Sequence, residues 1–322
     1  MKRLFLILFL ALFAVCFHSY GQGQNLEWFK CETSKYGFRD IVSYRIEIPC
    51  QFEDVWGRFS EGLACVKLNN KWGFIDETGK TVIPFKYDRI EGFSEGLAAV
   101  KLNNKWMFID KNDKIVIPLL QKDEPRYLPY EAVTRFSEGL ASVFLNGKCG
   151  AIDKTGKVVI PLWYQYLCNF SEGLVRTKIN NKWGFLDTIG KIAVPFRYDD
   201  VWYFREGLSA VKLDGKCGFI DKTGKIVIPL RYDAAESFHD GLAWVELNGK
   251  YGYVDKTGKV IIPLKYQSVY DFYDGLAMVK LNNWWGAIDK TGEIVIPIKY
   301  NLYDARKRTE IARELLKLFK EN

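Results

Sequence analysis

Histidine is almost absent from this 322-residue sequence, which contains only His18 and His239. His18 lies in an N-terminal segment assigned below to targeting, so a histidine-dependent catalytic triad would have one possible base. No sequence pattern places a serine or cysteine nucleophile beside His239. The same repeat position holds Ser, Arg or Tyr in other copies, and we therefore expect His239 to be an exposed side chain without a catalytic role.

Clustered metal ligands are also lacking. The seven cysteines form no Cys-x-x-Cys motif and no Cys/His cluster, so we expect no metal site and no cofactor. Cys149 and Cys217 occupy a repeat position that holds Trp or Tyr in other copies, which favours small, buried, apolar side chains. Cys31 and Cys50 are the one pair that we consider for a disulfide, near the N-terminal end.

Long apolar runs are confined to the N-terminus. Lys2 and Arg3 precede an apolar run over residues 4–17, which is too short to span a bilayer. This pattern is typical of a signal peptide at residues 1–21, cleaved before Gln22. We therefore expect export to the bacterial periplasm, outer surface or extracellular space, with no integral membrane segment after cleavage.

The sequence also lacks a cluster of charged residues of one sign. Removal of Lys2 and Arg3 with the signal peptide lowers the net charge from +7 to +5, and the remaining lysines recur once per repeat. Nucleic-acid binding needs a clustered basic patch, so we expect no nucleic-acid partner. The acidic residues also recur in every copy, whereas a catalytic residue is needed once, and we expect the protein not to be an enzyme.

Aromatic residues are abundant at 16% of the chain, with only three Met, a composition that favours strands. The tripeptides Glu-Gly-Leu and Asp-Gly-Leu recur along the sequence at spacings of 34, 43, 34, 34, 34 and 34 residues. Their glycines are at positions 62, 96, 139, 173, 207, 241 and 275. Such self-similarity indicates a tandem array of seven copies, one of which carries an insertion at 119–129.

Each copy has the pattern of a β unit. A proline interrupts the same apolar run in every copy, which a helix does not tolerate, and the apolar residues alternate with period two. In the copy at 204–233, Asp214-Gly215 and the segment 221–224 suit two hairpin turns. We predict a three-stranded antiparallel meander with a short fourth strand in the linker, which must stack on its neighbours to bury both faces.

The recurring run is Phe-x-Glu-Gly-Leu-Ala-x-Val-Lys-Leu-Asn-Asn-Lys-Trp-Gly-Phe-Ile-Asp-x-Thr-Gly-Lys-x-Val-Ile-Pro, clearest at 59–84, 170–195 and 272–297. It resembles the WG, or KWG, repeat family over residues 59–300, although Met107 replaces the Gly of one Trp-Gly pair. That family is not tied to one biochemical activity. The resemblance therefore implies a repeat architecture and a binding role.

These patterns divide the chain into four parts. They are a signal peptide (1–21), an N-terminal segment with a degenerate half repeat (22–58), seven repeats (59–301) and a C-terminal capping helix (302–322). The unequal ends favour an open, curved, solenoid-like all-β array, with a closed propeller-like ring as the alternative.

The C-terminal helix is predicted to be amphipathic and to cover the last exposed sheet edge. Its apolar stripe consists of Ile311, Leu315, Leu318 and Phe319. A role at a membrane surface is the weaker alternative, since acids lie on the polar face at Glu310 and Glu314.

Specific binding is expected in the linkers, because the repeated Trp and Asp residues fit packing and turn capping in every copy. The candidate ligand-binding residues are the linker aromatics Trp163, Tyr164, Trp202, Tyr203, Tyr270 and Tyr273. We expect an exported, non-enzymatic interaction or scaffold module whose partner is an envelope or extracellular protein. The alternative is a glycan- or cell-wall-binding protein that uses these aromatics as stacking platforms.

Overall fold

The computed structural model describes residues 26–41, 43–118 and 130–320. The predicted signal peptide at 1–21 and the insertion at 119–129 lie outside these residues. Eight small antiparallel sheets follow one another in chain order, and a helix comes after the last sheet. The predicted all-β tandem array with a C-terminal helix is therefore confirmed.

The N-terminal sheet contains β1 (Leu26–Lys30), β2 (Tyr36–Asp40) and β3 (Ile46–Phe52). The segment expected to hold a half repeat thus has three strands. A disulfide joins Cys31, just after β1, to Cys50 in β3, with Cα atoms 6.3 Å apart. It fixes the edge strand β1, whose sequence lacks the repeat motif.

The seven later sheets share one plan, in which three longer strands follow an inner strand that is only two residues long in five of the sheets. In the sheet without an inner strand, a bridge between Leu167 and Thr177 takes its place. This arrangement confirms the predicted meander with its short additional strand. The strands are β4 (Asp54–Ser60), β5 (Leu63–Leu68), β6 (Lys71–Asp76), β7 (Thr81–Tyr87), β8 (Arg89–Ile90), β9 (Ala98–Leu102), β10 (Lys105–Ile109), β11 (Ile115–Pro118), β12 (Ala132–Val133), β13 (Leu140–Leu145), β14 (Lys148–Asp153), β15 (Val158–Tyr164), β16 (Leu174–Ile179), β17 (Lys182–Asp187), β18 (Ile192–Tyr198), β19 (Asp200–Val201), β20 (Leu208–Leu213), β21 (Lys216–Asp221), β22 (Ile226–Tyr232), β23 (Ala234–Ala235), β24 (Leu242–Leu247), β25 (Lys250–Asp255), β26 (Val260–Tyr266), β27 (Ser268–Val269), β28 (Leu276–Leu281), β29 (Trp284–Asp289) and β30 (Ile294–Tyr300).

The recurring Asp closes the turn before the outer strand. In the first full copy, Asp76 Oδ1 accepts hydrogen bonds from the backbone N–H groups of Thr78 and Lys80, each at 3.0 Å. It also accepts a bond from the Thr78 hydroxyl at 2.6 Å. Since the same bonds recur in later copies, this Asp caps a turn, as predicted.

The core lies between neighbouring sheets. In most copies, the Phe of the Phe-x-Glu-Gly-Leu motif packs against an aromatic residue of the preceding sheet, as in Phe185–Phe204 with ring centroids 4.7 Å apart. The recurring Trp slot faces the same core, and Cys217 in that slot is buried. Each apolar cluster combines residues of two sheets, so a single copy cannot bury its own apolar face.

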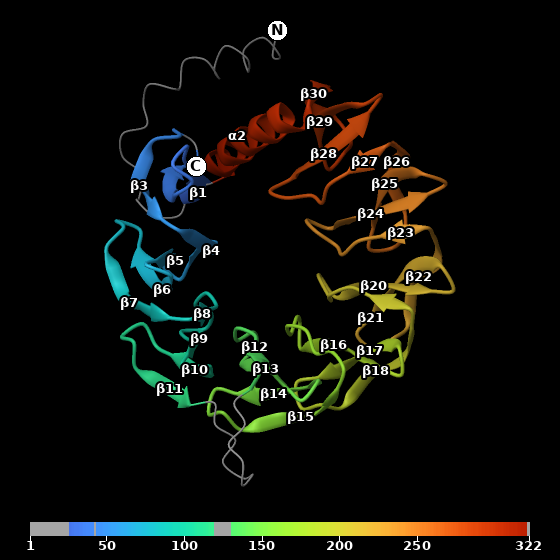
Figure 1. Cartoon of the computed structure of the whole chain (residues 1–322). Coiled ribbons are helices and arrows are strands. Elements are labelled where there is room, and N and C mark those ends of the chain that lie inside the picture. Colours follow the sequence, from blue (N-terminus) through green and yellow to red (C-terminus); the bar gives the residue numbers. More distant parts are fainter. Residues whose placement is uncertain (1–25, 42, 119–129, 321–322) are drawn as a thin grey trace.

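Figure 1 shows that the sheets follow one another around an open centre, with the short strands inside and the proline-containing strands outside. The first and last sheets lie on either side of α2 (Leu302–Lys320). Among the described strands, every sheet is built from consecutive strands, so no shared sheet joins the two ends. The array is therefore curved, as predicted. Its curvature resembles that of the propeller-like alternative, but the first and last sheets share no strand.

Helix α2 occupies the seam between these ends. It packs on β28, β29 and β30 through the fully buried Ala305 and Thr309, and Lys307 Nζ lies 4.5 Å from the centroid of the Tyr44 ring in the first sheet. The prediction of Ile311 on the covered face is wrong, because the helix turns Ala305 and Thr309 inward and leaves Ile311 exposed. The side chains of Leu315, Leu318 and Phe319 lie outside the described set. In the described part of the chain, no helix is long and apolar enough to cross a membrane.

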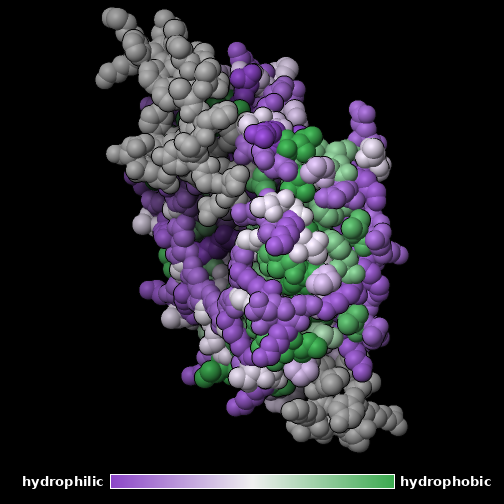
Figure 2. Space-filling view, turned by 90° about the vertical axis from the view of Figure 1, so that its left-hand side faces the viewer, coloured by the Kyte–Doolittle hydropathy of each residue, from purple (hydrophilic) through white to green (hydrophobic). Residues whose placement is uncertain are grey.

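The outer strands expose branched apolar side chains. Figure 2 shows apolar patches among polar ones on the side of the ring that carries β3, β7 and β11. Ile46, Val82 and Ile115 on these strands are exposed. The exposed Pro84 in β7 cannot donate a ladder hydrogen bond, which limits pairing of this outer edge with another chain.

Candidate functional site

A tight turn places the residue before the recurring Glu or Asp at the same point of each copy. In the fifth copy, the Arg205 N–H donates to the carbonyl oxygen of Leu208 at 2.9 Å. Glu206 and Gly207 between them have φ angles of 53° and 86°. Two consecutive positive φ angles define a rigid two-residue turn, so the residue before Glu is held in a fixed direction.

The recurring carboxylates in these turns link neighbouring copies. Glu206 Oε1 accepts a hydrogen bond from the Gly241 N–H at 3.1 Å, and Lys256 Nζ lies 3.0 Å from Glu206 Oε2. Burial opposes ionisation of Glu206, but Lys256 and the Gly241 N–H outweigh it and lower the pKa of this carboxyl. The same link joins Glu61 to Gly96, Glu95 to Gly139, Glu138 to Gly173, Glu172 to Gly207 and Asp240 to Gly275.

The residue before the carboxylate has two forms. In the first four copies it is a Ser whose hydroxyl donates to the carbonyl oxygen of the Phe in the next copy. These serines are Ser60, Ser94, Ser137 and Ser171, with distances of 2.7, 2.7, 2.9 and 2.7 Å. In the last three copies the position holds Arg205, His239 and Tyr273.

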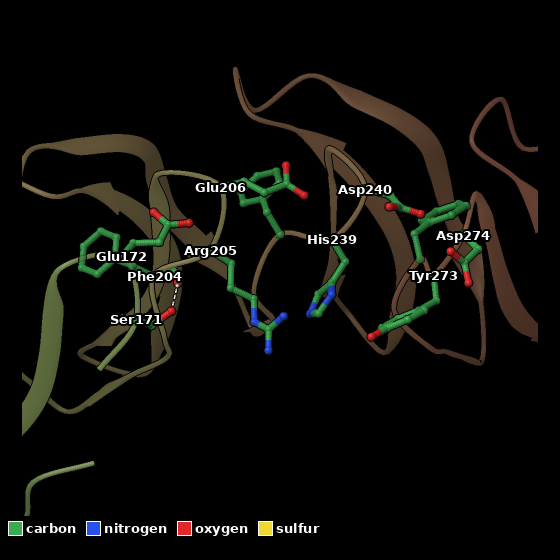
Figure 3. A pocket seen from close by; sticks show the side chains of 11 residues that line it. Ser171, Glu172, Phe204, Arg205, Glu206, His239, Asp240, Tyr273 and Asp274 are labelled. Atoms are coloured by element: carbon green, nitrogen blue, oxygen red, sulfur yellow. Dashed lines mark hydrogen bonds between the residues drawn. The ribbon is translucent and has the colours of Figure 1, made fainter. Parts of the chain in front are cut away.

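Arg205, His239 and Tyr273 line a groove of about 530 Å³ on the last four copies. Figure 3 shows Arg205 and His239 side by side with the Tyr273 ring beyond them. Glu206 and Asp240 extend to the opposite side of the turns in this view. The centroids of the His239 and Tyr273 rings are 6.4 Å apart. The groove therefore presents a guanidinium, an imidazole and a phenol in a row.

His239 is held by the neighbouring copy. Its Nε2 lies 3.7 Å from Asp271 Oδ2, and only 16% of its side chain is exposed. The expectation of an exposed side chain is therefore wrong, because Asp271 and Tyr273 from the next copy cover the ring. Burial raises the pKa of Asp271 above its ordinary value; His239 opposes this effect and Glu236 adds to it. Sequence reasoning missed the pair since its partners are far apart in the chain.

Helix α2 borders the far end of this groove. Arg313 lies with its guanidinium carbon 5.9 Å from the Tyr273 ring centroid, and its Nη2 donates to the carbonyl oxygen of Leu276 at 3.1 Å. Burial lowers the pKa of Arg313, while the nearby Asp274 opposes that shift. The C-terminal helix thus contributes a cation beside the last turn.

Of the predicted linker aromatics, only Tyr273 lines the groove, where it is 60% exposed. Tyr270 lies nearby in the chain and packs against Trp285 at a centroid distance of 5.5 Å. Trp202 is half-buried against an apolar core cluster, and the Tyr203 ring lies 4.2 Å from the guanidinium carbon of Arg176. Both of these residues have packing roles.

Trp163 and Tyr164 lie elsewhere. They belong to β15, which is at the opposite edge of its sheet from the inner strand β12. Trp163 is 73% exposed, whereas Tyr164 is buried in the core. The structure therefore does not bring the six predicted residues together into one site.

A second hollow of about 510 Å³ lies on the first four copies, lined by residues of inner strands and linkers that include Trp56, Glu91 and Arg135. Trp56 Nε1 donates to Glu91 Oε2 at 3.3 Å. Burial raises the pKa of Glu91, while Trp56 and Arg135 oppose this shift. Within the described ranges, no group of three His, Cys, Asp or Glu side chains is arranged to hold a metal ion.

Repeated antiparallel sheets around a centre, joined by identical links and varied mainly in their loops, define a tandem β-repeat protein with propeller-like architecture. The chain belongs to the family of WG containing repeat proteins. The family profile matches residues 45–72, 72–106, 130–149, 150–183, 183–217, 218–251, 251–283 and 285–304. No curated protein sequence matches the chain.

The chain is similar to several solved structures at low sequence identity. One described as the crystal structure of the eukaryotic initiation factor has 11% identity and a TM-score of 0.58, covering 84% of each chain. Dihydro-heme d1 dehydrogenase NirN in complex with DHE has 13% identity and a TM-score of 0.48, covering 88% of this chain and 75% of that one. BamB from Moraxella catarrhalis has 12% identity and a TM-score of 0.42, covering 84% and 95%. The first of these supports the architecture alone.

Proposed function

We propose that this chain is an exported, non-catalytic interaction module that holds a protein partner in the groove of its last four copies. One observation carries the proposal. The repeat position that bonds the scaffold through Ser in the first four copies holds Arg205, His239 and Tyr273 in the last three, all lining one groove. Residues that depart from a repeat in the loops of an array are typical of binding surfaces.

The environment of the groove favours binding over catalysis. The acids beside it accept backbone hydrogen bonds, as Glu206 does from Gly241 and Asp240 from Gly275. These carboxylates recur in every copy and couple the sheets, which is a structural task. The Arg and Tyr side chains that remain are the residue types most often found at the energetic centres of protein interfaces.

The disulfide supports export. Disulfides such as Cys31–Cys50 form and persist in oxidising compartments, including the bacterial periplasm and the cell exterior. We expect the mature protein to begin at Gln22 and to be located in the envelope or the medium. Cell fractionation with N-terminal mass spectrometry tests this, and a cytosolic chain that still begins with residues 1–21 would contradict it.

A pull-down from envelope extract tests the binding role. The bait is the mature protein, compared with a variant that carries Arg205→Ser, His239→Ser and Tyr273→Ser. Because four other copies already have Ser in this turn, we expect the variant to fold and to lose the partner. Trp163→Ala, which changes an exposed aromatic outside the groove, is the control and should retain it. A partner that binds the triple-serine variant equally well would refute the proposal.

A glycan ligand is the second candidate, favoured by the exposed rings of Trp163 and Tyr273. A polysaccharide panel tests it with the variants Trp163→Ala and Tyr273→Ala. Variants of Trp202 and Tyr203 are unsuitable, because these residues pack in the structure. Absence of retention on every glycan would remove this candidate and leave the protein partner.

A further inference from the structure

Carboxylates of the groove accept hydrogen bonds from the protein itself. The guanidinium of Arg205 makes no such bond within the described residues. Glu172 and Glu206 each accept a Gly N–H from the next copy and lie 3.2 and 3.0 Å from a Lys Nζ. Asp240 accepts the Gly275 N–H at 2.7 Å. The Arg205 side chain is exposed, and no hydrogen bond or ion pair joins its guanidinium to another residue of the described ranges, although its charge acts with that of His239 on the nearby Asp271. The groups left to meet a ligand are therefore mainly donors.

Arg205 and His239 form the donor pair. They occupy equivalent turn positions in adjacent copies, and Figure 3 shows them side by side, on the side of the turns away from Glu206. Asp271 lies 3.7 Å from His239 Nε2, so it orients the imidazole and acts as a positioning residue. A guanidinium beside an imidazole suits a carboxylate, which the planar fork of Arg binds through two parallel hydrogen bonds.

The spacing of the row fits an extended chain. The His239 and Tyr273 ring centroids are 6.4 Å apart, and alternate side chains of an extended peptide are separated by about 6.6 Å. The 60% exposed Tyr273 ring offers a flat face for the second side chain. The volume of about 530 Å³ is within the range of ligand clefts.

Building on the binding role above, we propose that the groove recognises an extended acidic segment of a protein. An Asp or Glu carboxylate of this segment lies between Arg205 and His239, and the side chain two residues further along packs on Tyr273. The partnered carboxylates of Glu172, Glu206, Asp240 and Asp274 also line the groove. Their charge disfavours a dianionic phosphate or a polyphosphate more than a single carboxylate, which selects peptide acids over phosphate groups.

Fluorescence anisotropy with a labelled decapeptide of alternating Asp and Tyr tests this inference on the mature protein. A matched peptide has Asn in place of every Asp. We expect the Asp peptide to bind at least tenfold more tightly than the Asn peptide. We expect Arg205→Ser with His239→Ser to weaken the Asp peptide about tenfold and to leave the Asn peptide unchanged. Arg89→Ser removes one exposed cation from the inner strand β8 and should leave both affinities unchanged.

Several outcomes overturn the inference. Equal affinity for the two peptides, equal losses in the Arg89→Ser control, or tighter binding of inorganic polyphosphate than of the Asp peptide would each do so. If the triple-serine variant still loses its envelope partner in the pull-down, the binding role stands and only the acidic ligand is refuted. If that variant keeps its partner, both are refuted.

Discussion

At the scale of single residues, the glycine after each recurring Trp lies where no side chain fits. A Cβ on Gly218 would lie 2.5 Å from the carbonyl oxygen of Ile228, because the register between β21 and β22 shifts at this point. In the second copy, Met107 takes this position and pairs directly with Pro118. The Trp-Gly pair therefore marks a close approach of two backbones.

We predict that Gly218→Ala lowers the free energy of unfolding by about 1–3 kcal/mol, since backbone must move to admit the methyl group. Chemical denaturation of the purified protein measures the change. Gly92→Ala is the control, because a Cβ there meets nothing closer than Cys65 Sγ at 4.0 Å. Equal stability of the two variants would show that the close approach does not constrain this position.

The turn aspartates predict a dependence of stability on acid. Hydrogen bonds from Thr side chains, with help from backbone N–H groups, lower the pKa of Asp76, Asp153, Asp221 and Asp255. A carboxyl whose pKa is lower in the folded state contributes stability above its unfolded pKa, about 3.9, and loses it as pH falls through the folded value.

We therefore expect Tm to fall as the pH drops below about 4, in the window where these carboxylates take up protons. Thermal melts between pH 7 and pH 2 measure it. Thr223→Val removes one of the hydrogen bonds to Asp221 and should reduce the slope. A Tm that is unchanged between pH 5 and pH 2 would contradict the capping role.

These residues also show how far sequence could predict the site. The roles of Asp76 and its equivalents followed from the sequence, because cap and turn lie within four residues of each other. His239 was misjudged, since its environment comes from Asp271 in the next copy. Tyr273 was predicted as a linker aromatic with a binding role. Its neighbours Arg205 and His239 were not predicted, because they are distant in the chain and the fold brings the three turns together.

At the scale of elements, the disulfide holds the sheet that departs most from the repeat. β1 and β2 pair over five residues, but β1 carries none of the recurring motif residues. The strands of the full copies were predictable because alternation and turn residues recur. β1 was not, and neither was the covered face of α2, where packing on the last sheet selects Ala305 and Thr309.

Cys31→Ser with Cys50→Ser is expected to lower the opening free energy of β1–β3 by about 3 kcal/mol, because the bridge closes a loop with a sequence separation of 19. Native-state hydrogen exchange resolves this change, since the array need not unfold as one unit. The amides of β24–β26 are the internal control and should be unaffected. Uniform loss of protection across all sheets would show that the first sheet is coupled to the whole ring.

At the scale of the whole molecule, the seam between the first and last sheets is occupied by α2. Its contacts reach the last sheet through Ala305 and Thr309 and the first sheet through Lys307 and Tyr44. The core clusters of the array are each shared by neighbouring sheets and do not depend on the helix alone. Removing α2 should therefore change the shape of the ring more than its strand content.

We predict that a chain ending at Tyr300 has a larger radius of gyration by small-angle scattering, because the two ends lose their common neighbour. Its far-ultraviolet circular dichroism should keep the β signal. A chain ending at Lys320 is the control and should match the full protein. An unchanged radius of gyration in the shorter chain would show that the sheets hold their curvature without the helix.

The carboxylate-to-glycine links run in one direction, from each turn to the next one along the chain. Each unit between the first and the last copy thus presents a Gly N–H donor to its predecessor and a carboxylate acceptor to its successor. Because a helix and not a shared strand occupies the seam, the rotations of the sheets need not add up to one complete turn. Duplication or loss of a unit in the gene would therefore change the width of the opening that the helix must cover. The hydrogen bonds between neighbouring units would stay the same.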